Sequence, residues 1–436
     1  MEKQRILIIS YLFPPAGGIA VQRALSLAKY LPECGYDVHI LSARNAAGPV
    51  RDPELLRQVP AGVRLHQAFT PEIPFGVRQW LWKRLSGGGK ARPAQASTAG
   101  KRRFSVKGLV TDAVKRMLCP EPEVLWVPFA LRQARRIVKK YGIETVLVTA
   151  PPFSAFLVGN ALKEQFPDLK LVSDFRDDWL RFYLGEFDYQ KSDHTRRRAI
   201  EIERRTVELS DKVVVVTETM LAHIRARYPD QNPQKFALIP NGYDPGTFSA
   251  FQPRPHSGQK VIVSHVGTVY SASSPRYYLD ALDAMAADIR STIETRFIGR
   301  VAAEEAHFLA SRKSTVQALG FMPQDAAVRQ MEEADYLLLV MTDAASLTGK
   351  LFEYLATGKP ILAIVQPDGE VARILHETGA GWYAAPHDAA GIRSLLQQAY
   401  QRARNPQCGF KPNWEAIRRF ERPRLAAEFG KLLANA

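Results

Sequence analysis

The amino-acid sequence predicts an α/β protein made of two successive doubly wound domains, each built on a parallel sheet. Short apolar runs alternate with amphipathic helical segments, and this alternation starts again after residues 239–260, a stretch rich in Pro, Gly, Asn, Asp and Ser. Such alternation is typical of a parallel sheet covered by helices on both faces, and such a stretch is typical of a linker. The 436 residues allow two or three domains at roughly 100–200 residues each.

The first half opens with an apolar run at 5–13, which we expect to be the first strand. It ends in the loop Pro14–Gly18, and helical spacing follows over 20–31. Further strand-sized runs are YDVHILSA at 36–43, VRLHQAF at 63–69, TVLVTA at 145–150, LKLVSDF at 169–175 and DKVVVVT at 211–217. A basic insertion at about 75–120 interrupts the rhythm. We expect an N-terminal domain over 1–245.

The second half repeats the alternation. Strand-sized runs lie at 261–267, 295–299, 316–321, 335–341, 360–365 and 382–386, and helical spacing lies at 277–289, 351–358 and 391–404. We expect a C-terminal domain over 246–410, followed by a helical segment over 411–436.

The composition is that of a globular protein, with 46% hydrophobic and 24% charged residues. No apolar run approaches the ~20 residues that a membrane-spanning helix needs, and the N-terminus lacks the features of a signal peptide. Cys34, Cys119 and Cys408 are far apart and form no CxxC pattern, which argues against a disulfide framework or a zinc site. We therefore expect a cytoplasmic protein.

The net charge of +15 favours polyanionic partners. Residues 78–118 carry eleven Lys or Arg against one acid, together with Trp80 and Trp82. A basic segment that bears aromatic residues suits an anionic membrane surface, and we expect peripheral membrane association through it. A solvated loop without a partner is the alternative. Nucleic-acid binding is disfavoured because no recognised binding motif is present.

Three groups of residues could carry chemistry, and the first is the loop after the first strand. Gly17 and Gly18 let the backbone approach a ligand closely, with the amides of a helix start behind them. The loop is not GxGxxG, and the second strand ends without the acidic residue of a dinucleotide site. A tight turn without a ligand is the alternative.

The second group follows the strand at 169–175. Asp174, Arg176 and Asp177 stand there beside Asp178 and Trp179. Charges so close together are expected to be paired or exposed at a cleft, because isolated buried charges are costly. We expect a functional cleft, with a structural ion-pair cluster as the alternative. Adjacent aspartates such as Asp177 and Asp178 are weak support for a metal site.

The third group is a loop-to-helix junction at 348–360. Free amides at a helix start attract phosphate, Gly349 removes side-chain bulk and Lys350 adds a positive charge. Glu353, one turn later, can accept hydrogen bonds from the diol of a ribose. The junction lacks the Walker pattern. A capped helix with Lys350 and Glu353 paired is the alternative.

Several motifs together resemble the large retaining glycosyltransferase family 4, in its branch that builds bacterial surface polysaccharides. They are PPAGGIAVQR at 14–23, WVPFA at 126–130, TAPPFS at 149–154, DFRDDW at 174–179, IPNGYD at 239–244 and K-x-x-E-Y-L-A-x-G-K-P at 350–360. The resemblance runs over about 5–430. It implies the GT-B fold: two facing Rossmann-like, doubly wound domains with the active site in the cleft, and a C-terminal helix that crosses back to the N-terminal domain.

The resemblance also implies roles for residues of the C-terminal half. Glu353 corresponds to the glutamate that binds the donor ribose, and Arg276 is the best match for a basic residue after that domain's first strand. The diphosphate would be bound by Gly17 and Gly18 and by the loop that contains Ser346, Leu347, Thr348, Gly349 and Lys350. Asp174, Arg176 and Asp177 are the candidates for catalytic groups on the acceptor side.

The sequence departs from the family pattern at three positions. Ala345 stands where the family has a glutamate that contacts the donor sugar. Phe153 and Phe156 stand where a histidine on the acceptor side is common. These departures affect the sugar and the acceptor rather than the nucleotide.

The resemblance implies a retaining hexosyltransferase that moves a sugar from a nucleotide-diphosphate donor to a glycan or polyprenyl-linked acceptor. No metal ion and no other cofactor is expected, and the protein would lie on the inner face of the cell membrane. Two alternatives stay open. One is a weakly active or non-catalytic GT-B-fold protein at the membrane, and the other is a nucleotide-sugar epimerase.

Overall fold

The computed structural model describes residues 3–46, 51–71, 117–181, 193–254, 258–312, 314–344, 347–405 and 410–436. The basic segment 78–118 lies outside these ranges except for its last two residues, and Ala345 and Ser346 lie outside them as well. The chain divides into two compact units. The first consists of 1–216, 220–239 and 426–436, and the second of 217–219 and 240–425.

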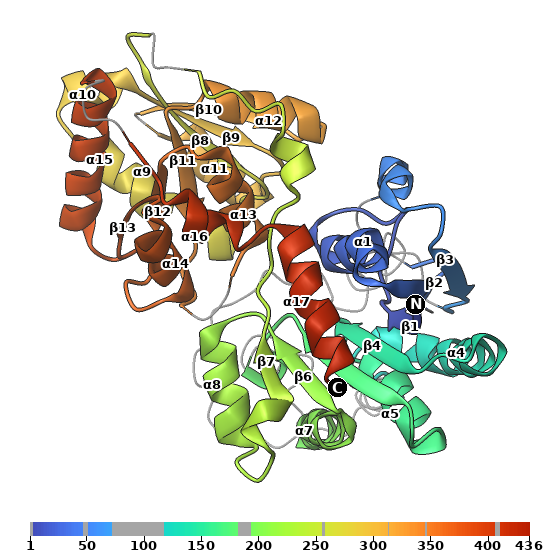
Figure 1. Ribbon diagram of the computed structural model, residues 1–436. Coiled ribbons are helices and arrows are strands. Elements are labelled where there is room, and N and C mark those ends of the chain that lie inside the picture. Colours follow the sequence, from blue (N-terminus) through green and yellow to red (C-terminus); the bar gives the residue numbers. More distant parts are fainter. Residues whose placement is uncertain are drawn as a thin grey trace, which may run out of the picture. The chain divides into compact units, whose positions relative to one another are not determined.

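The first unit contains a seven-stranded parallel sheet with the order β3-β2-β1-β4-β5-β6-β7 (Figure 1). Its strands are β1 (Gln4–Ile9), β2 (Tyr36–Ala43), β3 (Arg64–Ala68), β4 (Thr145–Ala150), β5 (Lys170–Phe175), β6 (Lys212–Val215) and β7 (Phe236–Leu238). Since β1 pairs with both β2 and β4, the strand order reverses at β1. Ligands of open α/β sheets bind beyond the carboxyl ends of the strands at such a reversal.

Helices cover both faces of this sheet. They are α1 (Ile19–Tyr30), α4 (Val127–Tyr141), α5 (Ala155–Gln165), α7 (Asp193–Leu209) and α8 (Glu218–Arg227), with 3₁₀ turns η1 (Leu31–Cys34), η2 (Pro53–Gln58), η3 (Pro122–Trp126) and η5 (Pro233–Lys235). The last eleven residues belong here too, at the end of α17 (Arg422–Ala434), where Tyr36 Oη donates to the carbonyl of Gly430 at 3.0 Å.

The second unit contains a six-stranded parallel sheet with the order β10-β9-β8-β11-β12-β13. Its strands are β8 (Val261–Val266), β9 (Ile293–Ile298), β10 (Thr315–Gly320), β11 (Tyr336–Val340), β12 (Ile361–Ile364) and β13 (Gly381–Ala384). Here the order reverses at β8, which pairs with β9 and β11. The carboxyl end of β8 is therefore the expected ligand site of this unit.

The helices of the second unit also lie on two faces of its sheet (Figure 1). They are α9 (Arg276–Asp283), α10 (Ala287–Thr292), α11 (Ala303–Ala310), α12 (Gln324–Glu333), α13 (Gly349–Thr357), α14 (Glu370–Thr378), α15 (Ala389–Arg404) and α16 (Trp414–Arg418), with η6 (Pro245–Phe248) and η7 (Ser271–Ser273). One buried cluster contains residues of α9 and α15, and another contains residues of α13 and α14.

Burial on both faces explains why the strands are almost continuously apolar. In β1, Leu7 and Ile9 join a cluster that includes α4 and α5, while Ile6 and Ile8, which are equally buried, alternate to the other face. The helices show the complementary pattern. In α4, the buried Ala130, Ala134, Ile137 and Val138 form one stripe, and the five basic residues of the helix lie outside it.

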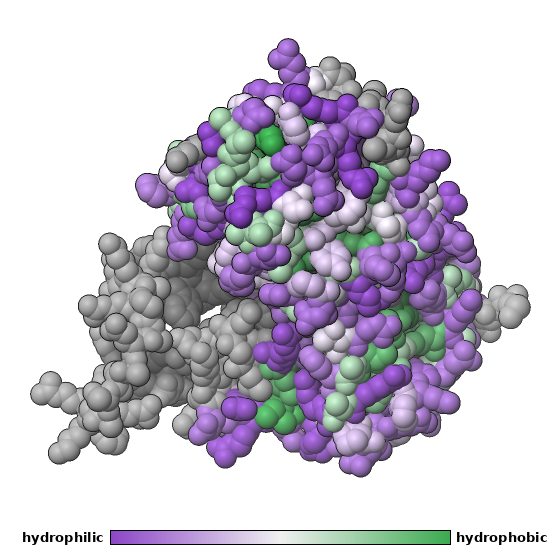
Figure 2. Space-filling view, turned by 90° about the vertical axis from the view of Figure 1, so that its left-hand side faces the viewer, coloured by the Kyte–Doolittle hydropathy of each residue, from purple (hydrophilic) through white to green (hydrophobic). Residues whose placement is uncertain are grey.

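The two parallel sheets confirm the predicted fold class. The prediction left out β7, because three residues are too few to give a periodic pattern. Among the residues that the structure describes, no helix is long and apolar enough to cross a membrane. Hydrophilic residues predominate on the face in Figure 2, with apolar residues scattered among them.

Candidate functional site

Two glycines lie at the carboxyl ends of strands in the second unit, where its strand order reverses. Gly267 follows β8 with φ 135°, and Gly299 follows β9 with φ 134°. The N–H of Gly267 donates to Ile298 O at 2.7 Å, which brings the two turns together. A Cβ atom on Gly267 would collide with the side chain of Lys350. Only glycine therefore lets Lys350 lie across this strand end.

Lys350 lies in the first turn of α13, at the junction that the sequence singled out. Thr348 caps the helix, since its hydroxyl accepts a hydrogen bond from the N–H of Lys350 at 3.4 Å. The ammonium of Lys350 is 3.1 Å from Nε2 of His265 and donates to the carbonyl of Thr268 at 3.2 Å. An ammonium has three donors, so within the described residues these two contacts leave one donor for a ligand. Burial lowers the pKa of Lys350 to about 8, and the charge of Glu353 opposes this shift.

His265 is the residue that sets the direction of the Lys350 ammonium, and the sequence analysis missed it. It is 1% exposed, and its Nδ1 lies 2.9 Å from the carbonyl of Leu338, so Nδ1 carries the proton and donates. Its Nε2 is then an acceptor for Lys350. Burial lowers the pKa of His265 to about 3, so the ring is neutral at physiological pH. His265 and Lys350 are 85 residues apart in the chain, and no local motif predicts their contact.

Glu353 lies one turn after Lys350 and is half-buried. Burial raises its pKa, with the charges of Arg422 and then Lys350 acting in the opposite direction. The next residue, Tyr354, anchors the helix, because its hydroxyl accepts from the N–H of Val266 at 2.7 Å. The start of α13 thus presents an ammonium and a carboxylate from a helix fixed to β8. This arrangement suits a ligand with both an anionic group and hydroxyls.

The other predicted donor-site residues have different surroundings. Arg276 lies at the start of α9. Its Nε is 3.4 Å from Oε1 of Glu305, and its Cζ is 4.1 Å from the ring centroid of Phe308; both partners are on α11. Across the part of the second unit that the structure describes, no hydrogen bond joins Arg276 to Lys350 or Glu353. Leu347 is half-buried beside the apolar cluster of α13, and Ser346 falls outside the described ranges.

In the first unit, Asp174 is the penultimate residue of β5 and forms a buried ion pair. Its carboxylate receives two hydrogen bonds from Arg23 of α1, at 2.8 and 2.7 Å, and one from the hydroxyl of Thr149 at 2.7 Å. Arg23 also donates to the carbonyl of Ile239 at 2.8 Å. Asp174 is 0% exposed. The pair fixes α1 to the centre of the sheet, behind the Gly17–Gly18 turn.

Arg176 and Asp177 follow directly. The guanidinium of Arg176 donates to the carbonyls of Ala150, Ala20 and Pro151 at 3.1, 2.5 and 2.5 Å. Burial lowers the pKa of Arg176, and the nearby carboxylates of Asp174 and Asp177 oppose the shift. Arg176 thus holds the end of β4 to the start of α1, whereas Asp177 is exposed.

The loop before α1 leaves the start of that helix open. Gly17 is half-buried, and Gly18 is exposed and precedes the helix with φ 84°. A Cβ atom on Gly18 would have no neighbour within 4 Å. No side chain at Gly18 therefore crowds the start of α1, where an anion site is predicted.

The two phenylalanines at the histidine position form an aromatic cluster. Phe153 stacks on Trp179 with ring centroids 4.7 Å apart, and the centroids of Phe156 and Phe175 are 4.3 Å apart. All four side chains are buried. This cluster contains no acid or base, and a titratable side chain near the end of β5 comes from another element.

His223 of α8 is such a group. Its Nδ1 is 2.7 Å from Asp178 Oδ2, and Arg227 donates to the other oxygen of Asp178 at 3.2 Å. The histidine side chain is 41% exposed, whereas that of Asp178 is 11% exposed. An Nδ1–H that donates to a carboxylate leaves Nε2 as the ring nitrogen that can accept a proton. The pairing spans 45 residues, so the DFRDDW motif alone does not reveal it.

Among the residues that the structure describes, no group of three or more His, Cys, Asp or Glu side chains could hold a metal ion. The candidate site is therefore built from cations, amides, hydroxyls and carboxylates.

The chain is similar to known glycosyltransferases. Residues 85–247 match the model of Glycosyltransferase Family 4. A 103-residue segment is 28% identical to the "Probable glycosyltransferase WbjE" of Pseudomonas aeruginosa, and it spans 24% of this chain and 21% of that relative.

Solved structures match over the whole chain at low identity. Sucrose-phosphate synthase from Thermosynechococcus elongatus is 16% identical with a TM-score of 0.64, and 99% of each chain is covered. HepE of Anabaena, solved in complex with UDP, is 14% identical with a TM-score of 0.62, covering 99% of this chain and 100% of that one. WaaG, a glycosyltransferase involved in lipopolysaccharide biosynthesis, is 14% identical with a TM-score of 0.60 and the same coverage. These likenesses show that the fold is the GT-B fold.

Proposed function

We propose that this chain, a member of glycosyltransferase family 4 by its matched segment and its GT-B fold, transfers a hexose from a nucleotide-diphosphate sugar. The acceptor would be a glycan or polyprenyl-linked intermediate of a bacterial surface polysaccharide. The observation that carries this proposal is the Lys350 ammonium, directed by neutral His265 beside Gly267 at the carboxyl end of β8. The names of the similar proteins point the same way, since WaaG acts in lipopolysaccharide biosynthesis and HepE was solved with UDP.

The nucleotide diphosphate would bind at the start of α13. The free donor of Lys350 and the amides of the first helical turn would bind phosphate oxygens, and Glu353 would accept from the ribose hydroxyls. Arg276 and the Gly17–Gly18 turn are the further candidates for the diphosphate. Ala345 has no carboxylate that could contact the sugar. The residues around Lys350 therefore account for binding of the nucleotide, and the identity of the hexose is not specified.

Transfer would proceed with retention at the anomeric carbon. Negative charge develops on the leaving diphosphate in the transition state, and positive groups already aimed there lower the barrier. Lys350 and the helix amides would supply this stabilisation without a metal ion.

On the acceptor side, we assign the exposed Asp177 and the dyad of His223 and Asp178 to the region where the acceptor hydroxyl binds. Asp174 and Arg176 would position these groups by fixing α1, β4 and β5 at one edge. Nε2 of His223 would take up the proton of the hydroxyl, in place of the histidine that Phe153 and Phe156 replace.

The protein would work at the cytoplasmic face of the membrane, where a polyprenyl-linked acceptor resides. The basic residues of 78–118 would attract anionic headgroups.

A screen of nucleotide sugars for release of the diphosphate tests the function, and titration calorimetry with UDP and GDP tests the site. We expect one nucleotide to bind and at least one of its sugars to be consumed when acceptor is present. Failure of every nucleotide to bind would favour the non-catalytic alternative. Interconversion of two nucleotide sugars without transfer would favour the epimerase.

A further inference from the structure

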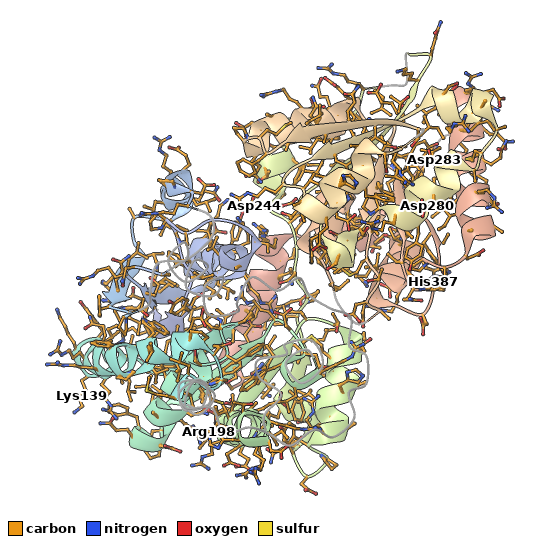
Figure 3. All side chains as sticks on the ribbon, turned by 180° about the vertical axis from the view of Figure 1, so that it is seen from behind. Lys139, Arg198, Asp244, Asp280, Asp283 and His387 are labelled. Atoms are coloured by element: carbon orange, nitrogen blue, oxygen red, sulfur yellow. The ribbon has the colours of Figure 1, made fainter. Side chains whose placement is uncertain are left out.

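The outer face of α4 carries an unusual concentration of positive charge. The helix has no acidic residue, and its five cations are all exposed: Arg132, Arg135, Arg136, Lys139 and Lys140. At 100° per residue they fall on one continuous side of the helix, opposite the buried stripe. Figure 3 shows Lys139 at the outer edge of the first unit.

These cations are available to a partner. Within the described ranges, none of the five forms a salt bridge, although elsewhere in this unit exposed arginines such as Arg64 and Arg204 are paired. Lys139 lies over the ring of Phe166 at 6.0 Å, and Lys140 lies over that of Tyr141 at 5.0 Å. A folded surface normally intersperses both signs of charge, so five cations on one helix, without a salt bridge to any described residue, favour an anionic partner.

An exposed aromatic pair lies on the same face. Phe129 of α4 is 43% exposed and contacts Phe69, which is 46% exposed, with ring centroids 5.4 Å apart. Phe129 precedes Arg136 by seven residues and Lys140 by eleven, so the three share a stripe of the helix. Apolar rings beside cations match the boundary between headgroups and acyl chains, where rings lie below the phosphates.

We propose that this face of α4, with Phe69 and Phe129, docks the protein on an anionic lipid bilayer. The apolar stripe of α4 packs on the core of the protein, so the helix lies against the membrane surface and binds mainly through charge. Its 15 residues give a contact about 22 Å long at ~1.5 Å per residue, enough for several headgroups. The inference adds a second contact to the proposed function and does not depend on the segment 78–118.

Vesicle binding of the full chain tests the proposal. Vesicles of phosphatidylcholine with 30% phosphatidylglycerol are compared with phosphatidylcholine alone at 0.1 M salt, by co-sedimentation over a range of lipid concentrations. The test variant is R132Q/R135Q/R136Q. The matched control is R196Q/R197Q/R198Q, which removes three exposed arginines from α7 and lowers the net charge equally. Of these three arginines, Arg198 is labelled in Figure 3.

We expect the α4 variant to partition on the order of 100-fold more weakly, because each basic residue near the headgroups contributes about 1 kcal/mol. The α7 control should partition like the wild type, and F129S should weaken binding further without any change in charge. Circular dichroism and UDP titration should be unchanged in every variant, which separates the docking surface from the nucleotide site.

Four results would overturn the inference: no binding of the wild type to anionic vesicles, equal binding of the α4 variant and the wild type, equal weakening by both triple variants, or equal binding to the two vesicle types. A short RNA is the competing anionic ligand. If the α4 variant lost RNA binding but kept vesicle binding, α4 would be a nucleic-acid surface instead. If the protein did not bind UDP but still bound vesicles through α4, the proposed function would be wrong and the docking surface would stand.

Discussion

A single ammonium group, that of Lys350, carries the donor-site proposal, and its replacement is the most direct test. We expect Lys350→Ala to weaken UDP binding by about tenfold to hundredfold, because a hydrogen bond to a charged group contributes roughly 1.5–3 kcal/mol. Titration calorimetry at pH 7 measures the change. Lys411→Ala, which removes an exposed lysine of the same unit, should bind UDP like the wild type. Equal affinity of the Lys350→Ala variant and the wild type would remove Lys350 from the site.

The lowered pKa of Lys350 makes nucleotide binding depend on pH in a defined direction. Lys350 is charged below about pH 8 and neutral above it, so affinity should fall as the pH rises from 7 to 9. The fall should be about tenfold when only the charged form binds, since each pH unit beyond the pKa lowers the charged fraction tenfold. Calorimetry in matched buffers follows it. Lys350→Arg should flatten the profile because arginine stays charged, and a wild-type profile as flat as that of the arginine variant would contradict the assignment.

Between elements, the buried pair of Arg23 and Asp174 joins α1 to β5. We expect Arg23→Met to lower the free energy of unfolding by about 3–5 kcal/mol, because it leaves a buried carboxylate without its partner. Urea unfolding followed by circular dichroism measures the loss. The exposed pair of Arg57 and Glu54 provides the control, and Arg57→Met should change stability by no more than about 0.5 kcal/mol. Similar losses in the two variants would mean that Asp174 is not held as described.

The hydroxyl of Tyr354 joins α13 to β8 in the second unit. Tyr354→Phe leaves the N–H of Val266 without its side-chain acceptor, and we expect a loss of about 1–3 kcal/mol in the free energy of unfolding. UDP affinity should fall as well, since α13 positions Lys350 and Glu353. Urea unfolding and calorimetry measure the two effects. Tyr277→Phe, which removes the hydroxyl of a half-buried tyrosine on α9, is the control and should change neither quantity.

For the molecule as a whole, the sequence was sufficient for the fold class. The runs that became β1 and β8 are apolar because both faces of a parallel strand are buried, and this leaves a signal in any single sequence. The helix start at Thr348–Lys350 was also predictable, because the capping threonine and the glycine before the lysine are local features of the sequence. The domain bounds and the roles of the predicted site residues stay predictions.

The contacts that position the site could not be predicted from the sequence. His265 meets Lys350 across 85 residues, and Arg23 meets Asp174 across 151. Such pairs arise when the strand order brings distant strand ends to one edge, and composition and spacing carry no record of them. The same holds for Arg276. Its place after the first strand of the second unit was predictable, but its ion pair with Glu305 of α11 was not.

The basic insertion at about 75–120 is a further candidate for contact with the membrane. Residues 86–105 contain five Lys or Arg and no acid, and their deletion should weaken binding to anionic vesicles by a separate contribution from that of α4. The two sites are independent if the deletion and the α4 triple variant weaken partitioning by factors that multiply in the combined protein. Replacement of the five basic residues by glutamine, which keeps the length of the segment, should reproduce the deletion. Transfer to a soluble acceptor should persist in both proteins, because the groups around Lys350 are unchanged. Co-sedimentation equal to that of the wild type would exclude the segment from membrane binding and leave α4 as the docking surface.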